Sequence, residues 1–247
     1  MLTLSEGFIM ARRNRRSQII QLEKVPTFKP KNQINIRPRT ERQTNAMEAW
    51  NDGKNLSLSG YAGTGKTFVA LHLALRAVEN YGEQEQVIIV RSTVPTREMG
   101  FLPGTTEEKI EVYEQPYYAL CHELTGNYNA YHELKKQGLL DFISTSFIRG
   151  CTLNDKVVIV DEMQNMNYHE LDSVITRLGT NSRLILCGDY RQSDFTRERE
   201  KEGMLNILKI LSEISEFEMI EFSKDDILRS SLVKKYIIMK EELKLVA

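Results

Sequence analysis

Residues 56–67 read Leu-Ser-Leu-Ser-Gly-Tyr-Ala-Gly-Thr-Gly-Lys-Thr, and this stretch decides the fold. The short run Leu56–Ser59 predicts a β-strand, and the apolar spacing over Lys66–Glu79 predicts a helix. Residues 60–67 match the pattern Gly-x-x-x-x-Gly-Lys-Thr. In such a glycine-rich turn, backbone N–H groups point at phosphate oxygens, and the following helix offers its positive N-terminus. The stretch therefore predicts a phosphate-binding loop between a strand and a helix.

The residue types in this loop predict a nucleoside triphosphate with Mg²⁺ as its ligand. The lysine at the end of the pattern, Lys66, reaches the β- and γ-phosphates, and the hydroxyl of Thr67 ligates Mg²⁺. The alternative is a plain glycine turn, which the flanking strand and helix disfavour. The candidate nucleotide-binding residues are Gly60, Tyr61, Ala62, Gly63, Thr64, Gly65, Lys66 and Thr67.

A second acidic motif follows another apolar run, Val157–Val160. Asp161, at the end of this predicted strand, is a candidate metal residue that orients a magnesium-bound water. Glu162 beside it can polarise the attacking water, a general-base role that favours hydrolysis over phosphoryl transfer to another molecule. The alternative is that the two acids merely end a strand.

A third polar segment, Gly188–Gln192, follows the predicted strand Leu184–Cys187. Ligands of open α/β sheets bind where such strands end. We expect Gln192 to sense the γ-phosphate as a catalytic residue and Asp189 to join the metal shell. Arg191 could face phosphate or nucleic acid, and the alternative for the segment is a polar loop without a role.

The whole chain alternates short apolar runs with helical stretches, which is typical of an α/β fold with a mostly parallel central sheet flanked by helices. Runs that are apolar on both faces indicate central strands. The predicted strands are Leu56–Ser59, Val87–Val90, Phe142–Thr145, Val157–Val160, Leu184–Cys187 and Phe217–Glu221. The predicted helices are Lys66–Glu79, Glu107–Leu124, His169–Leu178, Leu205–Ile214 and Leu232–Leu243.

Composition and charge separate a basic N-terminal extension, residues 1–39, from a domain over residues 40–247. The 247 residues are 41% hydrophobic and 27% charged with a net charge of −1, as in ordinary globular chains. Residues 1–42 nevertheless hold ten basic and three acidic side chains. This proline-containing arm is either a segment that binds nucleic acid or a solvated tail.

The same composition predicts a cytoplasmic protein without a membrane partner, because no apolar run is long enough to span a bilayer. The three cysteines support neither a disulfide framework nor a zinc site. Five tyrosines between residues 113 and 131 either stack on bases or pack in the core, and core packing is the more common role.

The motifs together resemble those of superfamily 1 helicases, in which a phosphate loop is combined with segments like Asp161–Gln164 and Gly188–Gln192. They are more similar to the PhoH family. That similarity also covers Thr40–Gln43, Val90–Ser92, Met99–Gly104, Phe147–Leu153, Asp161–Asn165 and Ile227–Ser230. The chain departs from the usual family pattern at Ser92, Cys151 and Met163, which leaves the preferred substrate open.

The resemblance implies a P-loop NTPase with a single RecA-like domain. It implies Mg²⁺-dependent ATP hydrolysis, coupled to binding or remodelling of RNA or single-stranded nucleic acid in a helicase-like manner. By the same resemblance, Gln43 would recognise the adenine base and Arg229 would match a catalytic arginine of the family. The resemblance also implies a homo-oligomer, namely a hexameric ring.

A catalytic arginine is expected because helicases of this resemblance place ATP between two RecA-like domains, and the second domain supplies an arginine to the γ-phosphate. A chain of 247 residues has room for one such domain. We expect the arginine to come from another copy or from a C-terminal position that folds back in the same chain. Arg229 is the first candidate and Arg191 the second.

Two other functions remain open from the sequence, a nucleotide-dependent switch and a small-molecule P-loop kinase, neither with a nucleic-acid role. A GTPase switch needs a guanine-reading motif, and the nearest match, Ser223–Asp226, lacks the leading Asn or Thr. A kinase needs an arginine-rich lid, which Arg191, Arg197 and Arg199 only faintly suggest.

Overall fold

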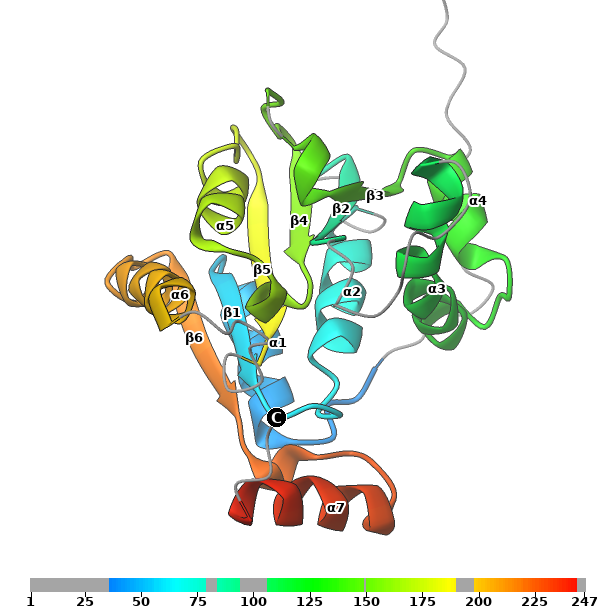
Figure 1. Cartoon of the computed structure of the whole chain (residues 1–247). Coiled ribbons are helices and arrows are strands. Elements are labelled where there is room, and N and C mark those ends of the chain that lie inside the picture. The colour runs from blue at the N-terminus through cyan, green and yellow to red at the C-terminus, as the bar shows by residue number, and fades with distance from the viewer. Residues whose placement is uncertain (1–35, 79–83, 94–105, 149, 190–197, 244–247) are drawn as a thin grey trace, which may run out of the picture.

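The structure is a computed structural model of the chain and describes residues 36–78, 84–93, 106–148, 150–189 and 198–243. These residues form one layered α/β unit (Figure 1). The predicted boundary between residues 39 and 40 stays a prediction. Ile36, near the start of the described part, already packs against the core.

A six-stranded sheet runs through the described part of the chain in the order β3-β2-β4-β5-β1-β6, and every adjacent pair is parallel. The strands are β1 (Asn55–Gly60), β2 (Gln86–Arg91), β3 (Leu140–Ser144), β4 (Lys156–Val160), β5 (Arg183–Gly188) and β6 (Phe217–Phe222). All six predicted strands are confirmed, with shifted ends, and the predicted α/β fold with a parallel central sheet flanked by helices is confirmed with them.

Helices cover both faces of the sheet, because alternate residues of the central strands point to opposite sides. On one face Val157 and Ile159 of β4 belong to a core shared with helices α1 to α4. On the other face Val158 and Val160 pack with helices α5 and α6. This two-sided burial explains why the central strands are continuously apolar.

Five helices lie where the sequence predicts them, with shifted ends, and two were not predicted. The predicted ones are α2 (Lys66–Arg76), α3 (Thr106–Thr125), α5 (Tyr168–Ile175), α6 (Glu198–Ser212) and α7 (Ser231–Glu242). The two others are α1 (Glu41–Asn51) and α4 (Ala130–Lys136). Helix α4 has only seven residues, and α1 buries only Gln43, Ala46 and Trp50, so neither shows a strong apolar period. The side chain of Thr40 caps α1.

The strand order brings three loops to one edge of the sheet. Strand β5 lies between β1 and β4, and the register pairs Ser59 with Gly188 and Val160 with Leu186. The strands are parallel, so their carboxyl ends meet at the same edge. The residues that follow β1, β4 and β5 are therefore neighbours in space, although more than 120 positions separate the first from the last in the chain.

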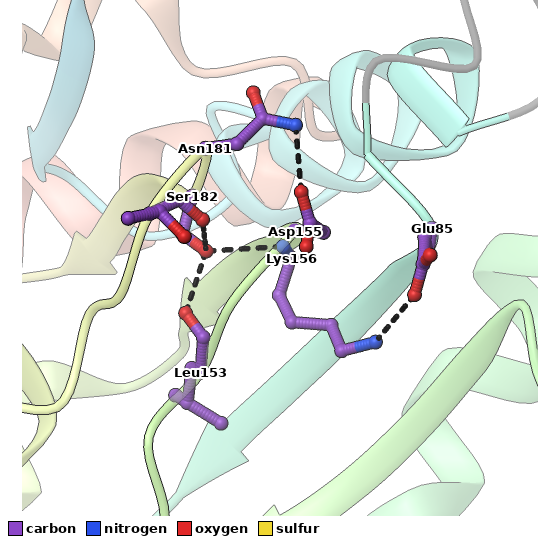
Figure 2. A network of polar contacts seen from close by, with 7 residues as sticks. Glu85, Leu153, Asp155, Lys156, Asn181 and Ser182 are labelled. Atoms are coloured by element: carbon purple, nitrogen blue, oxygen red, sulfur yellow. Dashed lines mark hydrogen bonds and ion pairs between the residues drawn. The ribbon is translucent and has the colours of Figure 1, made fainter.

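The opposite edge of the sheet is held by polar contacts between the segments that lead into β4 and β5 (Figure 2). Ser182 Oγ donates to the Leu153 carbonyl at 2.6 Å and accepts from the Lys156 N–H at 3.1 Å. Asn181 donates from its side-chain amide to Asp155 at 2.9 Å. These contacts fix the register of β4 against β5 at the edge of the sheet opposite the loops that follow β1, β4 and β5.

Helix α7 lies beyond the end of β6, apart from the sheet (Figure 1). It contains no buried residue. A 3₁₀ helix, η5 (Lys224–Asp226), connects it to β6. Among the described helices, none has both the length and the apolar character that a membrane span requires.

Buried His72 in α2 makes the stability of the fold sensitive to acid. Burial, with a smaller contribution from Arg76, lowers its pKa from 6.5 to about 4. The folded state therefore binds fewer protons than the unfolded state between these values, and stability falls as pH falls through this window. Because of this group, we expect the free energy of unfolding of the wild type to be about 2 kcal/mol lower at pH 5 than at pH 7.

Urea unfolding of wild type and His72→Gln at both pH values tests this expectation. His72→Gln should lose about 2 kcal/mol less than the wild type, while exposed His169→Gln should behave as the wild type does. An equal loss in wild type and His72→Gln would contradict the assignment.

Candidate active site

The glycine-rich loop connects β1 to α2 in the conformation that its sequence predicts. Gly60 has a φ of 116°, and a Cβ added there would lie 2.1 Å from the carbonyl oxygen of Phe222 in β6. Gly65 has a φ of 85° and forms the N-cap of α2. Other residues rarely adopt these backbone conformations, so the glycines permit both the turn and the close approach of β6.

Lys66 lies at the loop with its ammonium directed to backbone carbonyls. Its Nζ donates to the carbonyl oxygens of Gly60 and Tyr61, each at 2.7 Å. Burial lowers the pKa of Lys66, and the nearby carboxylates of Asp161 and Asp189 oppose that effect. A phosphate oxygen can replace a carbonyl as the partner of this ammonium, because both are acceptors.

Thr67 and Asp161 meet across the sheet edge. The Thr67 hydroxyl donates to Asp161 Oδ1 at 2.8 Å, and the Tyr117 hydroxyl donates to Asp161 Oδ2 at 2.8 Å. Burial, and then the charge of Glu162, raises the pKa of Asp161, whereas the two hydroxyl donors and Arg91 lower it. A buried carboxylate in such surroundings is stabilised by any added positive charge.

Glu162 has an unusual backbone conformation, with a φ of 52°. A left-handed backbone conformation at a non-glycine residue destabilises the folded state by about 1 kcal/mol or more, and such residues cluster at functional sites. Gln164 donates to the Glu162 carboxylate and accepts from the Asp189 N–H at 3.0 Å. The amide of Gln164 thus connects the loops after β4 and β5 and orients the Glu162 side chain.

Arg229 reaches the loop from the segment between β6 and α7 of the same chain. The Leu228 N–H donates to the Gly63 carbonyl at 2.9 Å. A Cβ added to Gly63 would lie 2.7 Å from Cγ of Arg229. The aliphatic part of this arginine therefore lies directly over the phosphate-binding loop.

A cavity of about 530 Å³ joins these groups. Its lining includes Ala62, Gly63, Gly65, Lys66, Thr67, Phe68, Arg91, Pro116, Tyr117, Leu120, Asp161, Glu162, Gln164, Gly188, Asp189 and Arg229. The volume is within the range of small-molecule sites. Three cationic residues, Lys66, Arg91 and Arg229, thus line the same cavity as the carboxylates of Asp161, Glu162 and Asp189.

Gln43 lies beside the loop but is not among the residues that line this cavity. Its side-chain amide donates to the Thr64 carbonyl at 3.0 Å and accepts from the Arg39 N–H at 2.9 Å. The side chain is buried and braces the backbone of the loop. Its expected role in reading adenine stays a prediction.

The sequence did not place Tyr117, Arg91 or Gln164 beside the phosphate-binding loop. Arg91 and Gln164 belong to segments that carry the family resemblance, whereas Tyr117 had no such signal. Tyr117 was one of five tyrosines predicted mainly for the core, and it is indeed buried. The predicted γ-phosphate sensor Gln192 and the second arginine candidate Arg191 lie outside the described residues.

The oxygen atoms at the mouth of the loop suit Mg²⁺. Thr67 Oγ1 and the Asp161 carboxylate are hard oxygen donors that lie side by side. The described residues include no group of three or more His, Cys, Asp and Glu side chains that could hold a metal. Mg²⁺ commonly uses one or two protein oxygens and takes its other ligands from water and phosphate, so the residues present fit this ion.

Comparison with solved structures finds similarity, at low sequence identity, to chains that include a terminase and a helicase. The large terminase of the thermophilic bacteriophage D6E, solved in complex with ADP, has a TM-score of 0.48 and 15% identity over 80% of this chain and 48% of that one. The Pif1 helicase of Candida albicans has a TM-score of 0.39 and 17% identity over 84% of this chain and 44% of that one.

Comparison with curated proteins finds relatives that share more of the sequence. A PhoH-like protein of Bacillus subtilis is 34% identical over 203 residues, which are 82% of this chain and 63% of that protein. A PhoH-like protein of Mycobacterium tuberculosis is 30% identical over 82% of this chain and 57% of its own length. The chain thus spans less than two thirds of these relatives. The family model described as PhoH-like protein matches residues 35–241, and the chain therefore belongs to the PhoH-like protein family.

Proposed function

We propose that the chain hydrolyses ATP with Mg²⁺ at the cavity over the glycine-rich loop. The observation that carries this proposal is the contact of Thr67 with Asp161 at 2.8 Å in a cavity that Lys66, Glu162 and Arg229 also line. The family membership supports a P-loop enzyme of this class. A cation, a metal-binding pair and a candidate base in one cavity are the groups that phosphoryl transfer to water requires.

Each group has a distinct part in the proposed reaction. Backbone N–H groups of the loop and the Lys66 ammonium bind the phosphates, and Thr67 with Asp161 would hold Mg²⁺, which neutralises charge on the phosphate oxygens. The Glu162 carboxylate accepts a proton from the attacking water, and Gln164 keeps that carboxylate oriented. No covalent intermediate with the protein is needed.

Lys66→Ala and Glu162→Gln should separate binding from hydrolysis. Lys66→Ala removes the cation opposite the β- and γ-phosphates, so we expect weaker ATP binding by about tenfold or more. Glu162→Gln should bind ATP as the wild type does and lose about 10²-fold or more in turnover. Fluorescence titration of labelled ATP and a phosphate-release assay measure the two effects. Wild-type turnover in Glu162→Gln would remove the general-base assignment.

The proposed catalytic arginine is Arg229, acting on ATP bound to its own chain. Support comes from the bond between Leu228 and Gly63, which anchors the segment to the loop of the same chain, and from Arg229 lining the cavity. A positive charge at the γ-phosphate is worth about 10³-fold or more in rate in related chemistry. With this arginine in cis, a neighbouring copy is not required to complete the site.

Mixing two inactive variants distinguishes action in cis from action in trans. We expect Arg229→Ala to lose about 10³-fold in turnover. A mixture of Lys66→Ala with Arg229→Ala should remain as inactive as its components, because every site then lacks one of the two residues. Recovery of turnover in the mixture would assign the arginine to a neighbouring copy instead.

We further propose that the chain assembles into a homo-oligomer, a hexameric ring by family resemblance. Exposed apolar side chains on and just after α7, namely Leu232, Tyr236, Met239 and Leu243, support a contact between copies. Light scattering of the purified chain measures the number of copies. A monomer at micromolar concentration would contradict this proposal.

The proposed partner is RNA or another single-stranded nucleic acid. The charge of the basic arm supports this part of the proposal. Residues 1–42 hold ten basic against three acidic side chains, whereas the whole chain has a net charge of −1. Contacts of basic side chains with phosphates release counterions and make binding salt-dependent. The proposed ATP-binding residues belong to other parts of the sequence than the arm, so the two interactions can be tested independently.

Deleting residues 1–35, which leaves the core contact of Ile36 in place, should leave basal ATP hydrolysis largely intact while it lowers both the affinity for single-stranded RNA and the salt dependence of binding. A charge control replaces Arg12, Arg13, Arg15 and Arg16 with Gln in the full chain, and it should reproduce part of the loss. Anisotropy titrations between about 50 and 200 mM salt give both quantities. If the deletion leaves the salt dependence of RNA binding unchanged, the arm is a solvated tail and does not bind nucleic acid.

A further inference from the structure

The buried hydroxyl of Tyr117 touches the carboxylate that would hold the metal. It donates to Asp161 Oδ2 at 2.8 Å, and the side chain is only 1% exposed. Tyr117 comes from α3 and Thr67 from the first turn of α2, whereas Asp161 follows β4. Two helices therefore converge on the carboxylate at the end of a strand.

The arrangement leaves the Asp161 carboxylate little rotational freedom. Thr67 donates to one of its oxygens and Tyr117 to the other, each at 2.8 Å. With both oxygens held, the carboxylate cannot rotate without breaking a buried hydrogen bond. Each oxygen still has a lone-pair direction for a further partner, because an ionised carboxylate accepts about four hydrogen bonds in total.

Tyr117 is suited to act as a permanent donor. Its ring packs in the core beside Phe142 of β3, with centroids 6.0 Å apart. Its hydroxyl is buried with the ring, and Asp161 Oδ2 is the acceptor of its hydrogen bond. The packed ring fixes where that hydroxyl points.

We propose that Tyr117 is a positioning residue for the magnesium site, which makes α3 part of the metal-binding machinery. The proposal rests on the proposed Mg²⁺-dependent hydrolysis of ATP. The Tyr117 hydroxyl presets the orientation of Asp161, so the metal does not have to order that carboxylate when it binds. Loss of the hydroxyl should then weaken the apparent affinity for Mg²⁺ more than it weakens nucleotide binding.

The neighbouring tyrosines of α3 provide a matched pair of variants. Tyr117→Phe removes only the hydroxyl and keeps the buried ring. Tyr118→Phe removes a hydroxyl one position along the same helix, where the ring packs against Tyr131 and His132 with both pairs of centroids 4.7 Å apart. Any difference between the variants therefore reports on the bond to Asp161. Tyr117→Leu gives a second removal of the hydroxyl with an apolar side chain.

The experiment measures the Mg²⁺ concentration that gives half-maximal ATP hydrolysis, together with the affinity for labelled ATP in EDTA. For Tyr117→Phe and Tyr117→Leu we expect the half-maximal Mg²⁺ concentration to rise about tenfold, as for loss of one hydrogen bond to a charged group. Their ATP affinity in EDTA should stay within about twofold of wild type, and saturating Mg²⁺ should restore much of the turnover. Tyr118→Phe should match the wild type in all three.

A comparison in the Asp161→Asn background tests whether the effect passes through Asp161. There, equilibrium binding of labelled ATP with and without Mg²⁺ replaces turnover as the measurement. Adding Tyr117→Phe should change the metal dependence no further. An unchanged half-maximal Mg²⁺ concentration in Tyr117→Phe, an equal loss of ATP affinity in EDTA, or a further loss in the Asp161→Asn background would each overturn the proposal.

The same data separate this inference from the proposed function. A wild type without Mg²⁺-dependent hydrolysis would refute the proposed function, and the inference with it. A wild type with that activity and a Tyr117→Phe variant indistinguishable from it would refute the inference alone.

Discussion

Parallel pairing of β1, β5 and β4 is the constraint on which the site depends. Because these strands point the same way, the loops that follow them lie at one edge of the sheet, where Thr67 meets Asp161 at 2.8 Å across 94 positions of sequence. An antiparallel partner at any of these places would move one loop to the far edge. The apolar cores on both faces, and the polar contacts at the opposite edge (Figure 2), keep this register fixed.

Much of this arrangement could be predicted from local sequence, because the signals are local. Central strands such as β4 are apolar on both faces, and the glycine-rich loop has a pattern of its own. Helices α1 and α4 lacked such a signal, since one buries few residues and the other has only seven. Asp161 could be chosen because it directly follows an apolar strand, whereas the position of Gln43 against Thr64 required the fold.

The rest of the site depends on contacts between distant elements, which residue spacing does not reveal. Tyr117 looks like any core tyrosine in the sequence, and only the packing of α3 against the sheet places its hydroxyl on Asp161. Arg229 was identified by family resemblance alone. Its location over Gly63 follows from the turn after β6, which returns the chain to the loop. The order of the strands therefore has to be known before these residues can be assigned.

Strand β6 is an edge of the described sheet, so one side of its backbone is not covered by another strand of that sheet. Its sequence, Phe-Glu-Met-Ile-Glu-Phe, exposes Glu218 and Glu221 to solvent. If two copies aligned these edges, carboxylates of like charge would face each other, and that repulsion opposes continuous sheet formation between molecules. The acidic residues of β6 therefore oppose edge-to-edge pairing of copies at the strand that also closes over Gly60.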